Sequence, residues 1–182
     1  GRVLPRLLDL NVPSDQKPRR AVFKHVQLGS EWKADFDRKK ILLAIHPDND
    51  QVWLWVIPFS DGSVSIGIVG TNEEIEPAGP DAQARYDHFV AAMGWDWLAD
   101  ATEVRPATEI VGYAASVREL YGDRFALLGN AAEFIDPIFS SGVTIAVKSA
   151  ALAVDVLDRQ LRGEAVDWEN EFANELEVGV EA

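Results

Sequence analysis

The chain has 182 residues, of which 47% are hydrophobic and 26% charged, and this composition predicts a folded globular protein rather than a disordered segment. Its formal net charge of −13 argues against a nucleic-acid partner, because an acidic surface repels a phosphate backbone. The absence of cysteine excludes a disulfide, a thiolate nucleophile and a cysteine-ligated metal, and a cytoplasmic location is expected. No apolar run predicts a membrane span, and the first ten residues do not resemble a secretory signal.

The first half of the sequence predicts a series of antiparallel strands. Residues 21–28 form the first expected strand, and three more follow at residues 41–46, 51–58 and 63–70. The sequences Pro-Asp-Asn-Asp and Phe-Ser-Asp-Gly separate these three strands, and both favour tight turns. The three strands are therefore expected to form an antiparallel meander.

Helices are expected mainly in the second half. Apolar residues at three- and four-residue spacing predict a helix over residues 81–93, and a strand is expected over residues 109–117. A short apolar strand at 124–129 precedes a long helix at 141–161 and a shorter acidic helix at 167–178. The polar residues of the long helix form one stripe, which predicts that the rest of its surface is buried. This order of elements indicates an α+β fold with a mixed, mainly antiparallel sheet and packed helices.

The turn before the long helix has features of a ligand-binding site. Gly129 lacks a Cβ atom, so the backbone of Gly129 and Asn130 can approach a ligand closely. Ser140, Ser141 and Gly142 lead into the helix, whose first backbone N–H groups have no intrahelical partner and attract anions. Serine and glycine are also common at helix starts that bind nothing, so both interpretations stay open.

The segment WLWVIP, residues 53–58, predicts a strand that is apolar on both faces. Trp53 and Trp55 share one face because side chains alternate along a strand. Two indoles on one face can line a flat pocket for an aromatic ligand, or they can fill a hydrophobic core.

Other familiar catalytic and binding motifs are absent from the sequence. The three histidines are far apart and lack the spacing of metal ligands, so no metal site is predicted. The chain has no serine-histidine-aspartate arrangement, GxGxxG loop or P-loop. The two segments described above are therefore the candidates for function.

Together, these segments resemble sequence patterns of the flavin-dependent halogenases. The family pattern WxWxIP is matched by residues 53–58. Four residues match the second family pattern, FxxPxxSxG: Phe134, Pro137, Ser140 and Gly142. The family's Gly-Asp motif for the FAD ribityl chain is matched by Gly129, with Asn130 in place of the aspartate. An amide can still hydrogen-bond a hydroxyl, although without the charge of a carboxylate.

The resemblance implies part of an FAD monooxygenase-like fold. Residues 1–118 would form the substrate-domain sheet with an inserted helix, and residues 119–182 the strand, turn and helix that return to the FAD domain. Gly1-Arg2 resembles the end of a family motif, so the chain is expected to be a later portion, inactive alone, without the upstream GxGxxG unit and relay lysine. One side of helix 141–161 should then be apolar and exposed.

The resemblance also implies the chemistry. In this family reduced FAD, oxygen and halide yield hypohalous acid, which passes through a tunnel to an electron-rich aromatic substrate. By similarity, Ser140 would be catalytic, and the backbone amides of Ser141 and Gly142 would bind the halide. FAD would be held by Gly129, Asn130, Pro137 and Gly142. The substrate pocket or tunnel would be lined by Trp53, Trp55, Pro58, Phe134 and Phe139.

The resemblance finally suggests a substrate class and partners. Phe139 stands where the tryptophan-specific branch of the family has a glutamate, so a phenol or pyrrole, free or tethered to a carrier protein, is expected in place of free tryptophan. A flavin reductase would supply the reduced FAD. Two alternatives stay open: a flavin monooxygenase or dehydrogenase that does not halogenate, and a non-catalytic module that binds small molecules.

Overall fold

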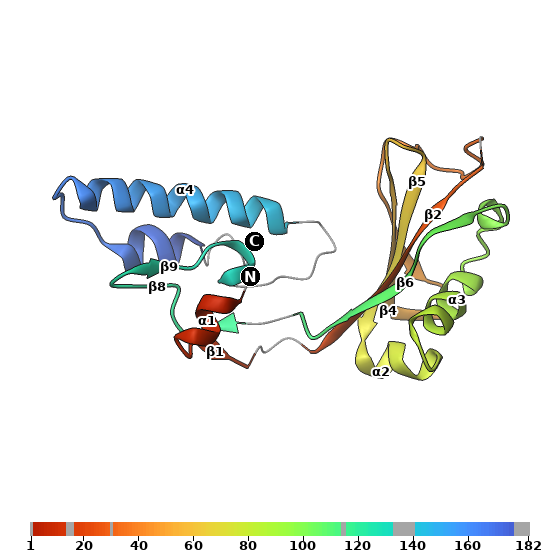
Figure 1. Ribbon diagram of the computed structural model, residues 1–182, viewed down its shortest axis with the longest axis horizontal. Coiled ribbons are helices and arrows are strands. Elements are labelled where there is room, and N and C mark those ends of the chain that lie inside the picture. Colours follow the sequence, from red (N-terminus) through yellow and green to blue (C-terminus); the bar gives the residue numbers. More distant parts are fainter. Residues whose placement is uncertain (1, 14–16, 30, 114–115, 133–140, 177–182) are drawn as a thin grey trace. The chain divides into compact units, whose positions relative to one another are not determined.

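The structure, a computed structural model, describes residues 2–13, 17–29, 31–113, 116–132 and 141–176. Close contacts group the chain into two compact units (Figure 1), here called the sheet unit, Lys17–Tyr113, and the helical unit, Gly1–Gln16 with Ala114–Ala182. This grouping differs from the expected division at residue 118, because residues 11–12 pair with residues 116–117. Among the described residues, no helix combines the length and apolar character needed to cross a bilayer.

The sheet unit is built on one antiparallel sheet with strand order β3-β4-β5-β2-β6. Its strands are β2 Arg19–Gln27, β3 Leu42–His46, β4 Asn49–Pro58, β5 Ser63–Thr71 and β6 Thr102–Val111. Strands β3, β4 and β5 pair in sequence order, which confirms the predicted meander. The prediction of one strand over residues 109–117 is wrong, because its first residues belong to β6 and its last two to a separate short strand, Ser116–Val117. Strand β6 begins at Thr102 and pairs with β2, and the chain turns away at Gly112, whose φ is +62°.

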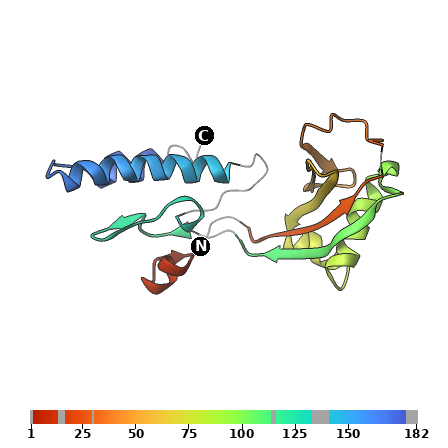
Figure 2. The ribbon, with the colours of Figure 1, turned by 45° about the horizontal axis from the view of Figure 1, so that its top comes forward.

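One face of this sheet packs against helices (Figures 1 and 2). The helices are α2 Asn72–Ile75, η1 Glu76–Ala78, α3 Ala82–Ala92 and η2 Asp96–Leu98. Asp81 caps α3 by accepting a hydrogen bond from the Ala84 backbone N–H at 2.9 Å. The core between sheet and helices contains Val22, Val52, Leu54, Val56, Ile66, Ile68, Ile75, Tyr86 and Phe89. Alternation along β4 therefore leaves Trp53 and Trp55 on the other face of the sheet.

The helical unit contains short strands and one long helix. Its elements are α1 Val3–Leu7, β1 Asn11–Val12, β7 Ser116–Val117, β8 Tyr121–Gly122, β9 Phe125–Ala126, η3 Gly129–Ala131, α4 Gly142–Leu161 and the π-helical turn η5 Glu169–Ala173. Leu10, Leu127, Val156 and Phe172 are among its buried core residues. The strand predicted at 124–129 is limited to Phe125–Ala126, because the chain enters a 3₁₀ turn at Gly129.

Helix α4 is buried on one side and apolar on the exposed side. Ile145, Ser149, Ala153 and Val156 are buried. The exposed fractions of Val143, Val147, Val154 and Leu161 are 75%, 65%, 65% and 78%. The prediction that only the polar stripe is exposed is therefore wrong. An apolar exposed side is what the resemblance to the halogenases leads us to expect.

Candidate functional site

The face of the sheet opposite helices α2 and α3, here called the open face, carries a continuous row of aromatic rings. Trp53 and Trp55 of β4 lie with ring centroids 6.0 Å apart, and Phe23 of β2 lies 6.2 Å from Trp55. His25 continues the row at 6.3 Å from Phe23, and Phe59 follows at 5.5 Å from His25. We call these five side chains the aromatic row. The alternation of side chains along β4 is enough to predict that Trp53 and Trp55 share one face. The positions of Phe23 and His25 beside them depend on the pairing of β2 with β5, which the sequence pattern does not reveal.

The two tryptophans differ in how they are held. The Trp55 indole N–H donates a hydrogen bond to Ser65 Oγ at 3.1 Å. Trp53 is only 6% exposed, and among the described residues its indole Nε1 has no hydrogen-bond partner. A buried donor without an acceptor costs about 1–3 kcal/mol, so such a group is a natural contact for a polar ligand or a water. This observation favours a pocket wall over a plain core at Trp53.

Pro58 is the last residue of β4 and pairs with Val64 at the end of the meander. It is half-buried, and Phe59 next to it is 38% exposed. Pro58 therefore lies at the Phe59 end of the aromatic row. Its expected place in the pocket or tunnel stays a prediction.

In the helical unit, Gly129 packs tightly against helix α4. Its φ of +51° lies in the left-handed region, and a Cβ at this position would lie 2.9 Å from the Ala146 Cβ. The Gly129 backbone N–H donates to Ser149 Oγ at 3.0 Å, and Ser149 is fully buried. Glycine is thus required by both conformation and space. Ser149 is a site residue that the sequence pattern does not single out.

The turn also brings Asn130 to the start of α4. Asn130 Oδ1 lies 3.7 Å from the position that a Cβ on Gly142 would take. Ser141 is the N-cap of α4 but makes no side-chain capping hydrogen bond. The structure therefore brings together four of the predicted residues, Gly129, Asn130, Ser141 and Gly142, and their roles stay predictions. Four other predicted residues lie outside the described residues: Phe134, Pro137, Phe139 and Ser140.

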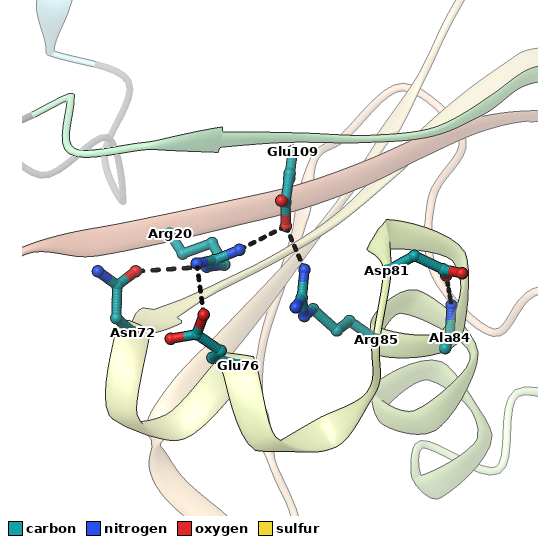
Figure 3. Close-up of polar contacts among 7 residues, drawn as sticks. All are labelled: Arg20, Asn72, Glu76, Asp81, Ala84, Arg85 and Glu109. Atoms are coloured by element: carbon teal, nitrogen blue, oxygen red, sulfur yellow. Dashed lines mark hydrogen bonds and ion pairs between the residues drawn. The ribbon is translucent and has the colours of Figure 1, made fainter.

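An ion cluster around two buried arginines, which the sequence pattern does not reveal, joins the sheet to its helices (Figure 3). Arg20 of β2 and Arg85 of α3 both donate to Glu109 Oε2 on β6, at 2.7 and 2.8 Å. Glu76 lies 3.7 Å from Arg20, and Asn72 Oδ1 accepts from Arg20 Nε at 3.3 Å. Burial alone would raise the pKa of Glu109, but the hydrogen bonds and charges of the two arginines outweigh it and lower that pKa. The contacts indicate a structural role in holding the helices on the sheet.

Comparison with known proteins identifies relatives of this chain. No family model matches it. The chain is 32% identical over 139 residues to a 1H-pyrrole-2-carbonyl-(peptidyl-carrier protein) chlorinase of Pseudomonas fluorescens, which corresponds to 67% of this chain and 30% of that relative. It is 26% identical over 138 residues to a flavin-dependent halogenase of Armillaria mellea, which corresponds to 70% of this chain and 26% of that relative.

Solved structures share the fold. A flavoprotein/dehydrogenase from Cytophaga hutchinsonii matches with a TM-score of 0.88 and 35% identity, over 100% of this chain and 44% of that protein. A myxobacterial chondrochloren halogenase, a variant of the FAD-dependent halogenases, matches with a TM-score of 0.68 and 30% identity, over 87% of this chain and 37% of that protein. The predicted α+β fold of the FAD monooxygenase-like type is confirmed. This chain spans at most 30% of the length of these two curated relatives, and in sequence and fold it is similar to a portion of the flavin-dependent halogenases.

Proposed function

We propose that this chain is part of an FAD-dependent enzyme that uses reduced FAD, oxygen and halide to halogenate an electron-rich aromatic substrate. The observation that carries the proposal is the position of Trp53 and Trp55, the two tryptophans of the WxWxIP pattern, in the aromatic row on the open face of the sheet. The buried indole N–H of Trp53, which has no hydrogen-bond partner in the part of the chain that the structure describes, supports a ligand-facing role for this pair.

The helical unit fits a flavin at the Gly129 turn. Gly129 lets the turn lie directly against Ala146 of helix α4, and the Asn130 amide that follows is suited to a hydrogen bond with a ribityl hydroxyl. We assign FAD binding to Gly129, Asn130, Pro137 and Gly142. When bound, FAD would supply the activation of oxygen. The backbone at Gly129 would position the cofactor, because a side chain there would displace helix α4.

The start of α4 fits a halide. Ser141 makes no side-chain capping hydrogen bond among the described residues, and the dipole of helix α4 favours negative charge at its first N–H groups. We assign the halide to the amides of Ser141 and Gly142, and we place Ser140 as the catalytic serine where the tunnel meets the substrate. Trp53, Trp55, Pro58, Phe134 and Phe139 would line the substrate pocket or tunnel and exclude water from the reactive oxidant.

The substrate is proposed to be a phenol or a pyrrole, free or tethered to a carrier protein. The Pseudomonas fluorescens relative acts on a pyrrole carried by a peptidyl-carrier protein, and Phe139 lacks the carboxylate of the tryptophan-specific branch. The expected protein partner is a flavin reductase, and no nucleic-acid partner is expected. The expected location is the cytoplasm.

A second candidate function is a flavin dehydrogenase or monooxygenase without halogenation. The 35% identity to the Cytophaga hutchinsonii flavoprotein/dehydrogenase, over the whole of this chain, favours it. The two candidates separate in one assay of the full-length enzyme with FAD, a flavin reductase, oxygen and a pyrrole or phenol substrate. A product that gains chlorine or bromine only when the halide is added supports the halogenase. Oxidised substrate with no incorporated halogen, at every halide concentration, supports the second candidate. A full-length protein without a flavin absorption spectrum contradicts both and leaves a non-catalytic binding module.

A further inference from the structure

We propose that Ser65 and Gly67 of β5 are positioning residues that hold the Trp55 indole flat against the sheet. The structural part of this inference stands on the contacts of Trp55 alone. Its consequence for catalysis rests on the proposed function, in which Trp55 lines the path of the halogenating species.

Ser65 fixes the polar edge of the indole. Its hydroxyl accepts the Trp55 N–H hydrogen bond at 3.1 Å, and Ser65 itself is only 6% exposed. Rotation of the indole about its side-chain torsions would break this bond and leave a donor without its acceptor. Losing such a pair is unfavourable where water has little access, so one indole orientation is favoured.

Gly67 makes room for the flat indole. Gly67 pairs directly with Trp55 across β4 and β5, and a Cβ at this position would lie 2.1, 2.3 and 2.4 Å from three atoms of the benzo ring, Cζ2, Cε2 and Cη2. The backbone at Gly67 is an ordinary strand conformation, so the requirement for glycine comes from space alone. Any side chain at this position would lift the indole from the sheet.

Trp53, the neighbouring tryptophan on β4, has neither a glycine opposite it nor a hydrogen-bond acceptor among the described residues. It pairs with Val69 on β5, which carries a branched side chain. Phe23, opposite Gly67 on β2, lies with its ring centroid 6.2 Å from that of Trp55. Ser65 and Gly67 therefore accommodate Trp55 and not Trp53.

The experiment substitutes Gly67→Ala and Ser65→Ala, each in the wild type and in a Trp55→Phe background. Two matched controls lie on the same strand. Gly70→Ala places its new Cβ at 3.0 Å from Ile75, and Ser63→Ala removes an equally buried hydroxyl that bonds Asp61. Melting temperature and near-ultraviolet circular dichroism of the 182-residue chain report folding and indole orientation. Halogenated product formed per reduced FAD oxidised, in the full-length enzyme, reports coupling.

We expect Gly67→Ala and Ser65→Ala to change the near-ultraviolet spectrum in the wild type but not in the Trp55→Phe background. Their stability losses should shrink in that background, since groups in contact are non-additive. Coupling should fall about tenfold or more, within the range that an ångström-scale misplacement costs, while both controls keep wild-type coupling.

Additive stability losses with an unchanged spectrum would overturn the structural part. Changed spectra with wild-type coupling would overturn the catalytic part. A wild-type enzyme that does not halogenate would instead refute the proposed function, and the spectra and melting curves would still decide how Trp55 is held.

Discussion

Replacement of Glu109 by glutamine should destabilise the sheet unit more than the loss of an ordinary surface ion pair. The side chains of Arg20 and Arg85 are each only 9% exposed, and Glu109 Oε2 bonds both. Removing one partner of a buried ion pair costs about 3–5 kcal/mol. We expect about 3 kcal/mol, at the low end of that range, because Glu109 is 31% exposed and Arg20 keeps its contact with Glu76.

Thermal unfolding of the Glu109→Gln variant measures this cost. A loss of 3 kcal/mol lowers the melting temperature of a unit of this size by about 12 °C or more. Glu103→Gln is the matched control, because Glu103 lies on the same strand and bonds Lys24 at 2.9 Å but is 49% exposed. The control should lose no more than about 1 kcal/mol. Equal losses in the two variants would refute a special role for the cluster.

The pH dependence gives an independent test of the same cluster. Since the pKa of Glu109 is lowered in the folded chain, its contribution to stability is present above the ordinary carboxyl pKa of 4.5 and is lost as the pH falls through the folded value. The stability difference between wild type and Glu109→Gln should therefore shrink in acid. A difference that stays constant down to pH 3 would contradict the ionic origin.

Three further predictions concern the helical unit, the halide site and a buried histidine. Gly129→Ala should destabilise the helical unit by about 2 kcal/mol from its left-handed φ and the contact with Ala146, and Ala146→Gly should restore part of the melting temperature. Ser141→Ala should leave halide-dependent turnover of the full-length enzyme nearly unchanged, whereas Gly142→Val should abolish it, and equal turnover in both would contradict the backbone site. Burial lowers the pKa of His46, so stability should fall as the pH drops below about 6.5, and a His46→Leu variant should lose that slope in its melting curves.

The strands of the meander could be predicted because their signals are local. The turn sequences between β3, β4 and β5 and the apolar runs on either side place each strand end within two residues of its observed position. Strand β6 gives no such signal. Residues 102–111 are mostly exposed and include Pro106, and they form a strand only because β2 lies beside them. Pairing over a long stretch of intervening chain cannot be inferred from local pattern.

The same contrast applies to the site. Alternation along one strand is enough to place Trp53 and Trp55 together on one face. The partners of Trp55, Ser65 and Gly67, become apparent only when the register between β4 and β5 is known. The residues of the ion cluster are even farther apart in the sequence, since 89 positions separate Arg20 from Glu109. Residues that act across strands are therefore the ones that a local sequence pattern does not reveal.

The two tryptophans of the WxWxIP pattern should consequently respond differently to the same substitution. Trp55→Phe removes a hydrogen bond and leaves Ser65 Oγ without its donor, whereas Trp53→Phe removes a buried N–H that has no partner among the described residues. Both variants lose similar ring volume, so Trp55→Phe should cost about 1 kcal/mol or more beyond Trp53→Phe in free energy of unfolding. The order should reverse for a polar ligand that accepts from Trp53, because only Trp53→Phe removes that contact. Urea unfolding of both variants, with and without the aromatic substrate, measures the two differences. Equal costs in the free chain would mean that the indole N–H groups are in equivalent surroundings, which the pairing of Trp55 with Gly67 and of Trp53 with Val69 does not allow.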